Sequence, residues 1–173
     1  MANLDYQAQF DIASQVPERA ELTAGWARDA AAYRAKARAE RDLAYGDDPR
    51  QKLDVFLPED DSVGAPVLFI HGGYWQYYDR SYFSHVARGL NARGRSVVIP
   101  DYSQAPGKTV RAIVEELRQA CIWTWQRFRQ RPVVIGHSAG GHMTASMLVT
   151  DWAARGQPAD MVRAACAFSG LFD

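Results

Sequence analysis

Three short runs of apolar residues constrain the fold of this chain most strongly. They cover residues 66–72, 95–102 and 131–138, are bounded by glycine or proline, and are rich in valine and isoleucine. Continuous apolar runs of this length are typical of strands that are covered on both faces. Helical stretches lie between them, at 80–93 and 109–129. Because strands that alternate with such helices form parallel βαβ units, the sequence predicts an α/β fold, a mostly parallel sheet with helices on both faces.

The flanking segments extend this pattern. Residues 17–41 open with a proline, which suits a first helical turn, and carry large apolar side chains at helical spacings, so we expect an amphipathic N-terminal helix. The apolar positions of that helix are Leu22, Trp26, Tyr33 and Ala37. Residues 51–58 alternate in the manner of a half-buried strand. A further helix is expected at about 139–153, followed by a buried strand at 163–170.

Length and composition favour a single domain. The chain has 173 residues, of which 47% are hydrophobic and 23% charged, and no linker, repeat or low-complexity tract divides it. We therefore expect one domain over 1–173, made of the N-terminal helix at about 17–41 and a core over 42–173. Lys plus Arg and Asp plus Glu both number 20. This balance gives no sign of a nucleic-acid or membrane partner and favours a small, weakly charged ligand.

Cysteine content and the N-terminal residues bear on the compartment. Cys121 and Cys166 fall in a predicted helix and a predicted strand, and two isolated thiols form neither a disulfide framework nor a metal site. The first ten residues lack the basic and apolar regions of a signal peptide, and no apolar run approaches the roughly 20 residues that span a bilayer. We expect a cytoplasmic protein that is neither exported nor inserted in a membrane.

The pentapeptide Gly136-His137-Ser138-Ala139-Gly140 is the strongest candidate for a functional site. It has the pattern G-x-S-x-G and joins a predicted strand to a predicted helix. Such a turn lifts the serine hydroxyl clear of the backbone, and small flanking residues let strand and helix approach closely. We predict that Ser138 is a nucleophile. A chance combination and a phosphate-binding loop are the alternatives, but the sequence has no G-x-x-x-x-G-K-[ST] pattern.

A second motif, His71-Gly72-Gly73-Tyr74-Trp75, follows the predicted strand at 66–70. Loops of this HGG type, in this position, supply the oxyanion hole of lipases and esterases. N–H groups held about 3 Å from a developing oxyanion lower the barrier to acyl transfer by several kcal/mol. We predict that Gly73 and Tyr74, or Gly72, provide these donors together with Ala139. An ordinary tight turn is the alternative reading, and the histidine is expected to fix the loop by hydrogen bonding.

The two motifs and the residues around them resemble a known family. The chain is similar to the arylformamidase (kynurenine formamidase) branch of the α/β-hydrolase superfamily and, more widely, to hormone-sensitive-lipase-like esterases. The resemblance covers roughly residues 40–173. It is carried by HGGYW at 71–75 with the aromatic-rich stretch that follows, by Pro100-Asp101-Tyr102 with Pro106, and by GHSAGGH at 136–142.

This resemblance implies the α/β-hydrolase fold and hydrolysis of a carboxylic ester or an aryl formamide, such as N-formylkynurenine. Ser138 would attack the carbonyl carbon and form an acyl-enzyme, which water would then hydrolyse. Neither a metal nor an organic cofactor is needed. The substrate would be a small acyl compound, and the aromatic residues after the glycines would receive its aryl group. Trp75 and Tyr78 are candidate pocket residues, with packing against the core as the alternative role.

A serine nucleophile also needs a histidine base and an acid, which in this fold follow the serine along the chain. His142 is the histidine after Ser138, but it lies one turn along the same helix, so we do not expect it to be the base. Asp173 is a candidate acid. In the family that the chain resembles, the acid and the histidine lie in later loops. We therefore expect a chain truncated before its last strands, with 163–170 as an apolar edge.

Three hypotheses about function remain open. The first is a hydrolase of the formamidase-like group, the second a general carboxylesterase of small acyl esters, and the third a non-catalytic binding protein of the same fold. We expect little or no turnover by residues 1–173 alone, because a serine without a base is a weak nucleophile. The sequence fixes neither the physiological substrate nor the oligomeric state, and a homodimer is compatible with it.

Overall fold

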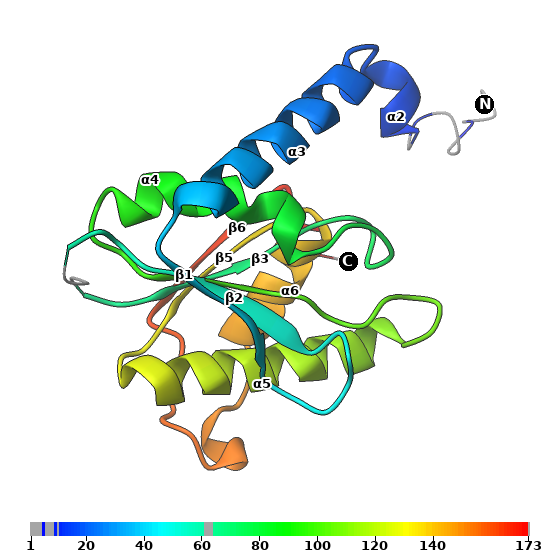
Figure 1. The fold of residues 1–173 in the computed structure, drawn as a ribbon. Coiled ribbons are helices and arrows are strands. Elements are labelled where there is room, and N and C mark those ends of the chain that lie inside the picture. Colours follow the sequence, from blue (N-terminus) through cyan, green and yellow to red (C-terminus); the bar gives the residue numbers. More distant parts are fainter. Residues whose placement is uncertain (1–4, 6–8, 10, 61–63, 173) are drawn as a thin grey trace.

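A six-stranded sheet runs through the middle of the molecule (Figure 1). The structure is a computed structural model, and it describes residues 5, 9, 11–60 and 64–172. The strand order is β1-β2-β4-β3-β5-β6. β3 is parallel to β4 and to β5, and β5 is parallel to β6, whereas β2 is antiparallel to both β1 and β4. The strands are β1 Ala39–Ala44, β2 Lys52–Phe56, β3 Val67–Ile70, β4 Val97–Pro100, β5 Val133–His137 and β6 Ala164–Phe168. The prediction of a mostly parallel α/β sheet is confirmed.

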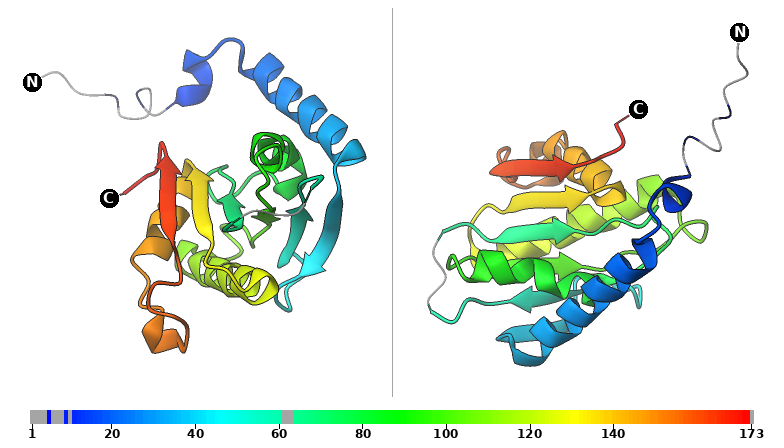
Figure 2. Two further views of the ribbon diagram at one scale, coloured as in Figure 1. Left: turned by 90° about the vertical axis from the view of Figure 1, so that its left-hand side faces the viewer. Right: turned by 90° about the horizontal axis from the view of Figure 1, so that it is seen from above.

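Helices cover both faces of the sheet, as expected (Figures 1 and 2). α5 and α6 pack on one face, and the second half of α3, η1 and α4 lie over the other. The helices are α2 Ile12–Gln15, α3 Arg19–Lys36, the 3-10 helix η1 Arg80–Val86, α4 Ala87–Asn91, α5 Val110–Phe128, α6 Ala139–Leu148 and the 3-10 helix η2 Ala153–Arg155. Among the described residues, no helix is both long and apolar enough to cross a bilayer.

Strand β3 shows why continuous apolar runs form the centre of this sheet. Leu68 and Ile70 belong to the hydrophobic cluster under α5 and α6, whereas Val67 and Phe69 belong to the cluster under η1 and α4. Successive side chains of a strand point to opposite faces, so a strand covered on both faces must be apolar at every position. Each such side chain contributes about 1.5–3 kcal/mol when fully buried. The order of the strands reverses between β3 and β5, which brings the loops after these two strands to one crevice.

The N-terminal helix is shorter than the predicted span of about 17–41. α3 covers Arg19–Lys36, and Ala37 already has an extended backbone, with φ −68° and ψ 142°. The next residues form β1, where Ala39 pairs with Phe56 of β2. Helical spacing of apolar residues could not reveal this change, because half of the residues of the edge strand β1 are charged and the strand is held by backbone pairing rather than by an apolar pattern.

Strand β6 departs from the prediction of a buried strand at 163–170. Its residues are mostly exposed, and the Phe168 side chain is 53% accessible. β5 is its one partner among the residues described, so its other edge is unpaired. The chain beyond β6 passes the first turn of α6 so closely that a Cβ on Gly141 would lie 2.9 Å from the Cα of Gly170. The strand is thus the apolar edge expected for a sheet without further strands.

The two cysteines are expected to react very differently with thiol reagents. Burial raises the pKa of the Cys121 thiol in α5 to about 12, whereas Cys166 in β6 is exposed. Since the thiolate is the nucleophile, iodoacetamide at pH 8 should modify Cys166 and leave Cys121 unmodified in folded residues 1–173. Peptide mapping by mass spectrometry would measure this, with urea-unfolded chain as the control in which both react. Equal labelling of both in the folded chain would contradict the burial of α5.

Candidate active site

Ser138 occupies a sharp turn between the end of β5 and the start of α6. Its backbone has φ 55° and ψ −121°, a conformation that residues other than glycine rarely adopt. Its N–H donates to the carbonyl oxygen of Phe168 at 2.9 Å, and its carbonyl accepts the N–H of His142 at 3.1 Å. The neighbouring strand and the following helix therefore hold this strained turn in place. The geometry is that of the predicted elbow.

Two glycines of the pentapeptide allow the elbow to form. A Cβ on Gly140 would lie 2.0 Å from the carbonyl oxygen of Ile70, at the end of β3. A Cβ on Gly136 would lie 2.2 Å from the carbonyl oxygen of Gly140. Both contacts are with backbone atoms, which cannot turn aside as a flexible side chain can. Helix α6 therefore approaches β3 and β5 only because neither position has a side chain.

Alanine at position 140 is expected to destabilise the protein by about 1–3 kcal/mol or more, because the methyl group would overlap the Ile70 carbonyl. Gly25 of α3 is a matched control, since a Cβ there would lie 3.7 Å from the Arg28 guanidinium. Gly25→Ala should change the stability by less than Gly140→Ala and in the stabilising direction, by up to about 1 kcal/mol, because alanine favours helix. Urea-induced unfolding would measure both, and equal stabilities of the two variants would contradict the close approach.

The HGG loop lies directly against the elbow. A Cβ on Gly72 would be 3.1 Å from the Cβ of Ser138, and Gly73 has a φ of 117° that favours glycine. Tyr74 also has a positive φ, of 52°. Within the described part of the chain, the N–H groups of Gly73, Tyr74 and Ala139 have no hydrogen-bond partner. The structure thus places the loop with the predicted N–H donors next to the predicted nucleophile.

His71 fixes the HGG loop through hydrogen bonds of its side chain and its backbone. Its side chain is fully buried, and its Nδ1 lies 2.8 Å from the carbonyl oxygen of Gly72, to which it donates. The C=O of a trans peptide points away from its N–H, so fixing the Gly72 carbonyl also fixes the direction of the Gly73 N–H. Tyr102 donates its hydroxyl to the carbonyl of His71 at 2.9 Å and stacks on the imidazole at 4.5 Å. The loop is held from both the side chain and the backbone of His71.

Removing the Nδ1 donor is expected to impair catalysis more than binding. His71→Phe keeps an aromatic ring between Phe83 and Tyr102, which stack on the imidazole, but it frees the Gly72 carbonyl. We expect kcat to fall by roughly 10- to 1,000-fold, the range for a weakened oxyanion hole, with KM changed little. Steady-state kinetics with p-nitrophenyl acetate on the complete protein would test this. A fall that appears in KM alone would contradict the positioning role.

A largely buried charge cluster connects η1 to the N-terminal helix. Arg80 of η1 forms ion pairs with Asp42, Asp54 and Asp101, and its backbone N–H donates to Asp101 at 2.6 Å. Asp54, which is fully buried in β2, also pairs with Arg34 of α3. Burial disfavours the charge of Arg80, but Asp101 and Asp54 outweigh it and raise the pKa of the guanidinium. This cluster was not predicted from the sequence, although Pro100-Asp101-Tyr102 marks one end of it.

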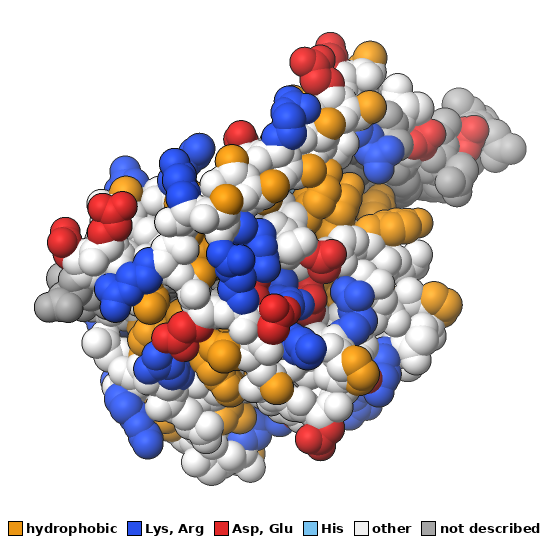
Figure 3. All heavy atoms as spheres, in the orientation of Figure 1, with side chains coloured by type: hydrophobic (Ala, Val, Ile, Leu, Met, Phe, Trp, Pro, Cys, Tyr) orange, Lys and Arg blue, Asp and Glu red, His pale blue; other side chains and the backbone are white. Residues whose placement is uncertain are grey.

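A cavity of about 600 Å³ opens beside Ser138. Figure 3 shows apolar side chains gathered where α3 passes over the rest of the molecule. One wall is the HGG loop and the aromatic stretch after it, and the opposite wall is the first half of α3. The lining residues are Val16, Arg19, Leu22, Thr23, Trp26, Gly72, Gly73, Tyr74, Tyr77, Tyr78, Phe83, His137 and Ser138. The predicted pocket residue Tyr78 lies here. The contribution of α3 was not predicted, because helical spacing identifies Leu22 and Trp26 as apolar positions of an amphipathic helix but does not show what they contact.

Trp75 does not take the predicted place in the pocket. It is absent from the cavity lining, and its indole ring lies edge-on to His142 of α6, with the ring centroids 5.4 Å apart. Positive φ values at both Tyr74 and Trp75, of 52° and 56°, turn the chain so that the two side chains diverge. Tyr74 consequently lines the cavity, whereas Trp75 packs against the core below α6.

The structure shows no proton acceptor on Ser138 within the residues that it describes. No histidine ring is hydrogen-bonded to the serine hydroxyl there, and burial lowers the pKa of His142, whose Nδ1 has no partner. Asp173, the candidate acid, lies outside the described residues. The described segments also contain no group of three or more His, Cys, Asp or Glu side chains that could hold a metal ion.

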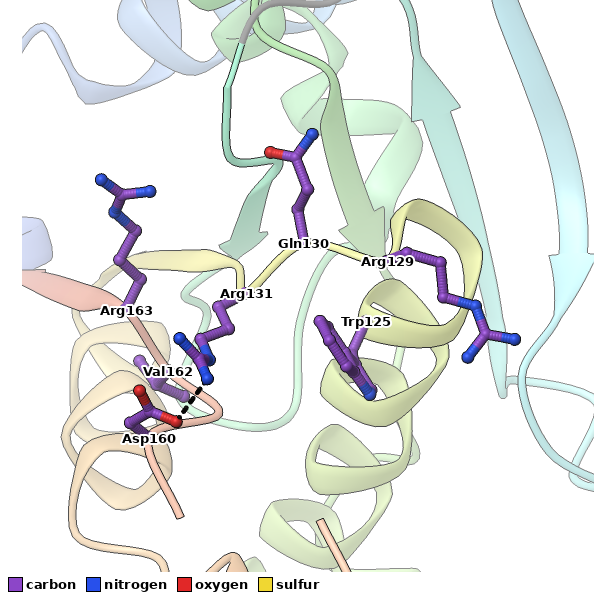
Figure 4. Close-up of a pocket in the computed structure, with 7 residues that line it drawn as sticks. All are labelled: Trp125, Arg129, Gln130, Arg131, Asp160, Val162 and Arg163. Atoms are coloured by element: carbon purple, nitrogen blue, oxygen red, sulfur yellow. Dashed lines mark ion pairs between the residues drawn. The ribbon is translucent and has the colours of Figure 1, made fainter. Parts of the chain in front are cut away.

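A second hollow, of about 380 Å³, lies at the other end of the sheet (Figure 4). Arg131 and Arg163 border it just before β5 and β6 begin, and Arg131 forms an ion pair with Asp160 at 3.0 Å. Ser138 follows the opposite, carboxyl end of β5. In open α/β sheets ligands bind at the carboxyl ends of the strands, so the cavity beside Ser138 is the candidate active site.

Comparison with known proteins agrees with this fold. The model of a family described as alpha/beta hydrolase fold matches residues 67–171. Kynurenine formamidase of Danio rerio is 33% identical over 135 residues, which are 76% of this chain and 46% of that protein. A crystal structure from Silicibacter sp. TM1040 has 35% identity and a TM-score of 0.76, covering 80% of this chain and 53% of that one. Esterase B of Lactobacillus rhamnosis has 27% identity and a TM-score of 0.55, covering 78% and 49%.

The chain belongs to the α/β hydrolase family. Within this family it is similar to the group that contains the arylformamidases and the hormone-sensitive-lipase-like esterases, as its motifs indicated. The relatives include hydrolases of ester and formamide type by name. The chain spans about half the length of the curated relatives that it matches, 46% in the case of the Danio rerio protein.

Proposed function

We propose that Ser138 is the nucleophile of a serine hydrolase that acts on a carboxylic ester or an aryl formamide. The observation that carries this proposal is the strained elbow at Ser138, with the HGG loop packed against it and three N–H groups nearby that have no partner among the described residues. Such donors stabilise an oxyanion that forms during acyl transfer more strongly than they bind a neutral carbonyl oxygen.

The proposed reaction proceeds through an acyl-enzyme. The Ser138 oxygen attacks the carbonyl carbon, and the carbonyl oxygen takes up negative charge beside Gly73, Tyr74 and Ala139. The alcohol or aromatic amine leaves with a proton, and water then releases the acid. The base that accepts the serine proton would come from residues outside the described ranges. The aromatic wall at Tyr77, Tyr78 and Phe83 would hold an aryl or acyl group.

A fluorophosphonate probe tests whether Ser138 is activated. The complete protein should react at Ser138, as located by peptide mapping, and the reaction should disappear in Ser138→Ala. Failure of the complete, folded protein to react would favour the third hypothesis, a non-catalytic binding protein. Residues 1–173 alone should show residual turnover at most, because an oxyanion hole without a base gives only a small part of the full rate.

Two substrates separate the two catalytic hypotheses. Similarity to kynurenine formamidases and the aromatic lining favour an aryl formamide, so N-formylkynurenine should have the higher kcat/KM. A strong preference of the complete protein for p-nitrophenyl acetate would instead support the general carboxylesterase, to which the similarity with esterase B points. Formate release and nitrophenolate absorbance provide the two readouts.

A further inference from the structure

The cavity beside Ser138 is apolar on nearly all sides but has one permanent charge. Of the described residues that line it, Arg19 is the one with a charged side chain, and aromatic or aliphatic groups dominate the rest. Within the described ranges the Arg19 guanidinium takes part in no ion pair or side-chain hydrogen bond. By contrast, Arg34 on the same helix is engaged by Asp54. A cation that lines a ligand cavity and has no partner is available to a ligand.

The helix that carries Arg19 is fixed at this point. The Tyr82 hydroxyl of η1 donates to the carbonyl oxygen of Thr23 at 2.6 Å, which ties this part of α3 to the aromatic wall. The Thr23 hydroxyl donates to the Arg19 carbonyl at 2.9 Å, so its donor is already engaged. Arg19 and Trp26 are separated by two helical turns and lie on the same face, about 10 Å apart along the axis.

We propose that the first half of α3 selects the substrate of this site, and that Arg19 binds a carboxylate on it. The inference rests on the proposed hydrolase function and names the class of substrate. That class has an aromatic or extended apolar body, which contacts Leu22 and Trp26, and a carboxylate remote from the scissile carbonyl. The charge complements Arg19, and the apolar area of the cavity matches the body.

Binding of two isosteric probes tests this without any chemistry. 4-Phenylbutyrate carries the carboxylate, and 4-phenylbutanamide is its neutral counterpart. Calorimetry on the complete protein should show that the carboxylate binds roughly 3- to 10-fold more tightly, as expected for one charge-assisted contact near the surface. Arg19→Gln should abolish the preference and Arg19→Lys should retain part of it. Because the Debye length is about 10 Å at 0.1 M salt, the preference should also shrink at higher ionic strength.

Arg28 provides the matched control. Both arginines are exposed and lie on the same helix, but Arg28 does not line the cavity. Arg28→Gln removes the same charge, so it should leave the preference for 4-phenylbutyrate intact. Equal loss in Arg19→Gln and Arg28→Gln would mean that net charge alone attracts the acid, and this would overturn the proposal. Equal affinity of the wild-type protein for both probes would also overturn it.

Kinetics then separate a failure of this inference from a failure of the proposed function. Mono-p-nitrophenyl glutarate and p-nitrophenyl pentanoate share a leaving group and differ in the terminal carboxylate. We expect Arg19→Gln to raise KM for the glutarate ester roughly 3- to 10-fold and to change KM for the pentanoate ester by a smaller factor. If the wild-type protein hydrolysed the two esters with equal KM, the proposed role of Arg19 would be contradicted, but the proposed hydrolase function would stand. If the protein preferred 4-phenylbutyrate but a fluorophosphonate did not label Ser138, the proposed role of Arg19 would stand and the proposed hydrolase function would be contradicted.

Discussion

Replacing Ser138 with alanine is expected to lower kcat of the complete protein by roughly 10⁴- to 10⁶-fold, the range for loss of a serine nucleophile that works with a base. The elbow places Ser138 between the HGG loop and the N-terminus of α6, and Ser138 lines the cavity, whereas Ser169, which also has a positive φ, does not. Alanine is smaller than serine and keeps the backbone, so the fold should persist. Initial rates with the preferred substrate measure the effect.

Ser146 supplies the control for this substitution. It lies on the same helix, two turns further on, and its hydroxyl donates to the carbonyl of His142 at 3.1 Å. Ser146→Ala should therefore leave kcat within about two-fold of the wild type, because a hydroxyl bonded to its own helix contributes little. Loss of activity in both variants would indicate a damaged helix, and retention of activity in Ser138→Ala would refute the nucleophile.

The largest effect on stability is expected at Asp54. Asp54→Asn keeps the shape of the side chain but removes the charge that Arg34 and Arg80 share, and the Arg80 Nε lies 3.0 Å from its carboxylate. Removing one partner of a buried ion pair costs about 3–5 kcal/mol, because the remaining charges stay buried without compensation. Urea-induced unfolding of the protein, followed by circular dichroism, measures the change.

Asp42 gives a comparison within the same cluster. It also pairs with Arg80, but its side chain is 64% exposed, so water can replace the interaction. Asp42→Asn should cost less than about 1 kcal/mol, as is usual for an exposed ion pair, and asparagine tolerates the positive φ at this position. If the two asparagine variants unfolded at the same urea concentration, the cluster would not act as a buried network.

Sequence reasoning predicted the central sheet well because its signal was local. The runs at 66–72, 95–102 and 131–138 contain β3, β4 and β5, whose burial between two layers of helices requires apolar residues at consecutive positions. The same reasoning failed at β1, a polar edge strand, and overestimated the burial of β6. Edge strands depend on their neighbours, and neighbours distant in sequence leave no periodic pattern.

In the candidate site, too, residues in local motifs could be predicted, whereas residues placed by the path of the chain could not. Gly72, Gly73 and Ser138 could be identified from two short motifs, because the backbone conformations that an elbow and an oxyanion loop need are specific to small residues. Arg19 and Trp26 could not, since their position beside the cavity depends on the path of α3 across the molecule. The orientation of Trp75 was equally hidden, because it follows from two positive φ angles that aromatic residues rarely adopt.

The close contact between Gly141 and Gly170 has a consequence for any polypeptide joined to this chain after residue 173. The chain leaves β6 at the same end of the sheet as the elbow, so a flexible extension would begin its path next to the cavity. Groups on such a tether have an effective concentration on the order of millimolar at the site, without any affinity of their own. A purification tag or reporter placed there would therefore compete with substrate even if its groups bind the cavity only weakly, whereas the same tag in the loop at 156–160, at the opposite end of β6, would not.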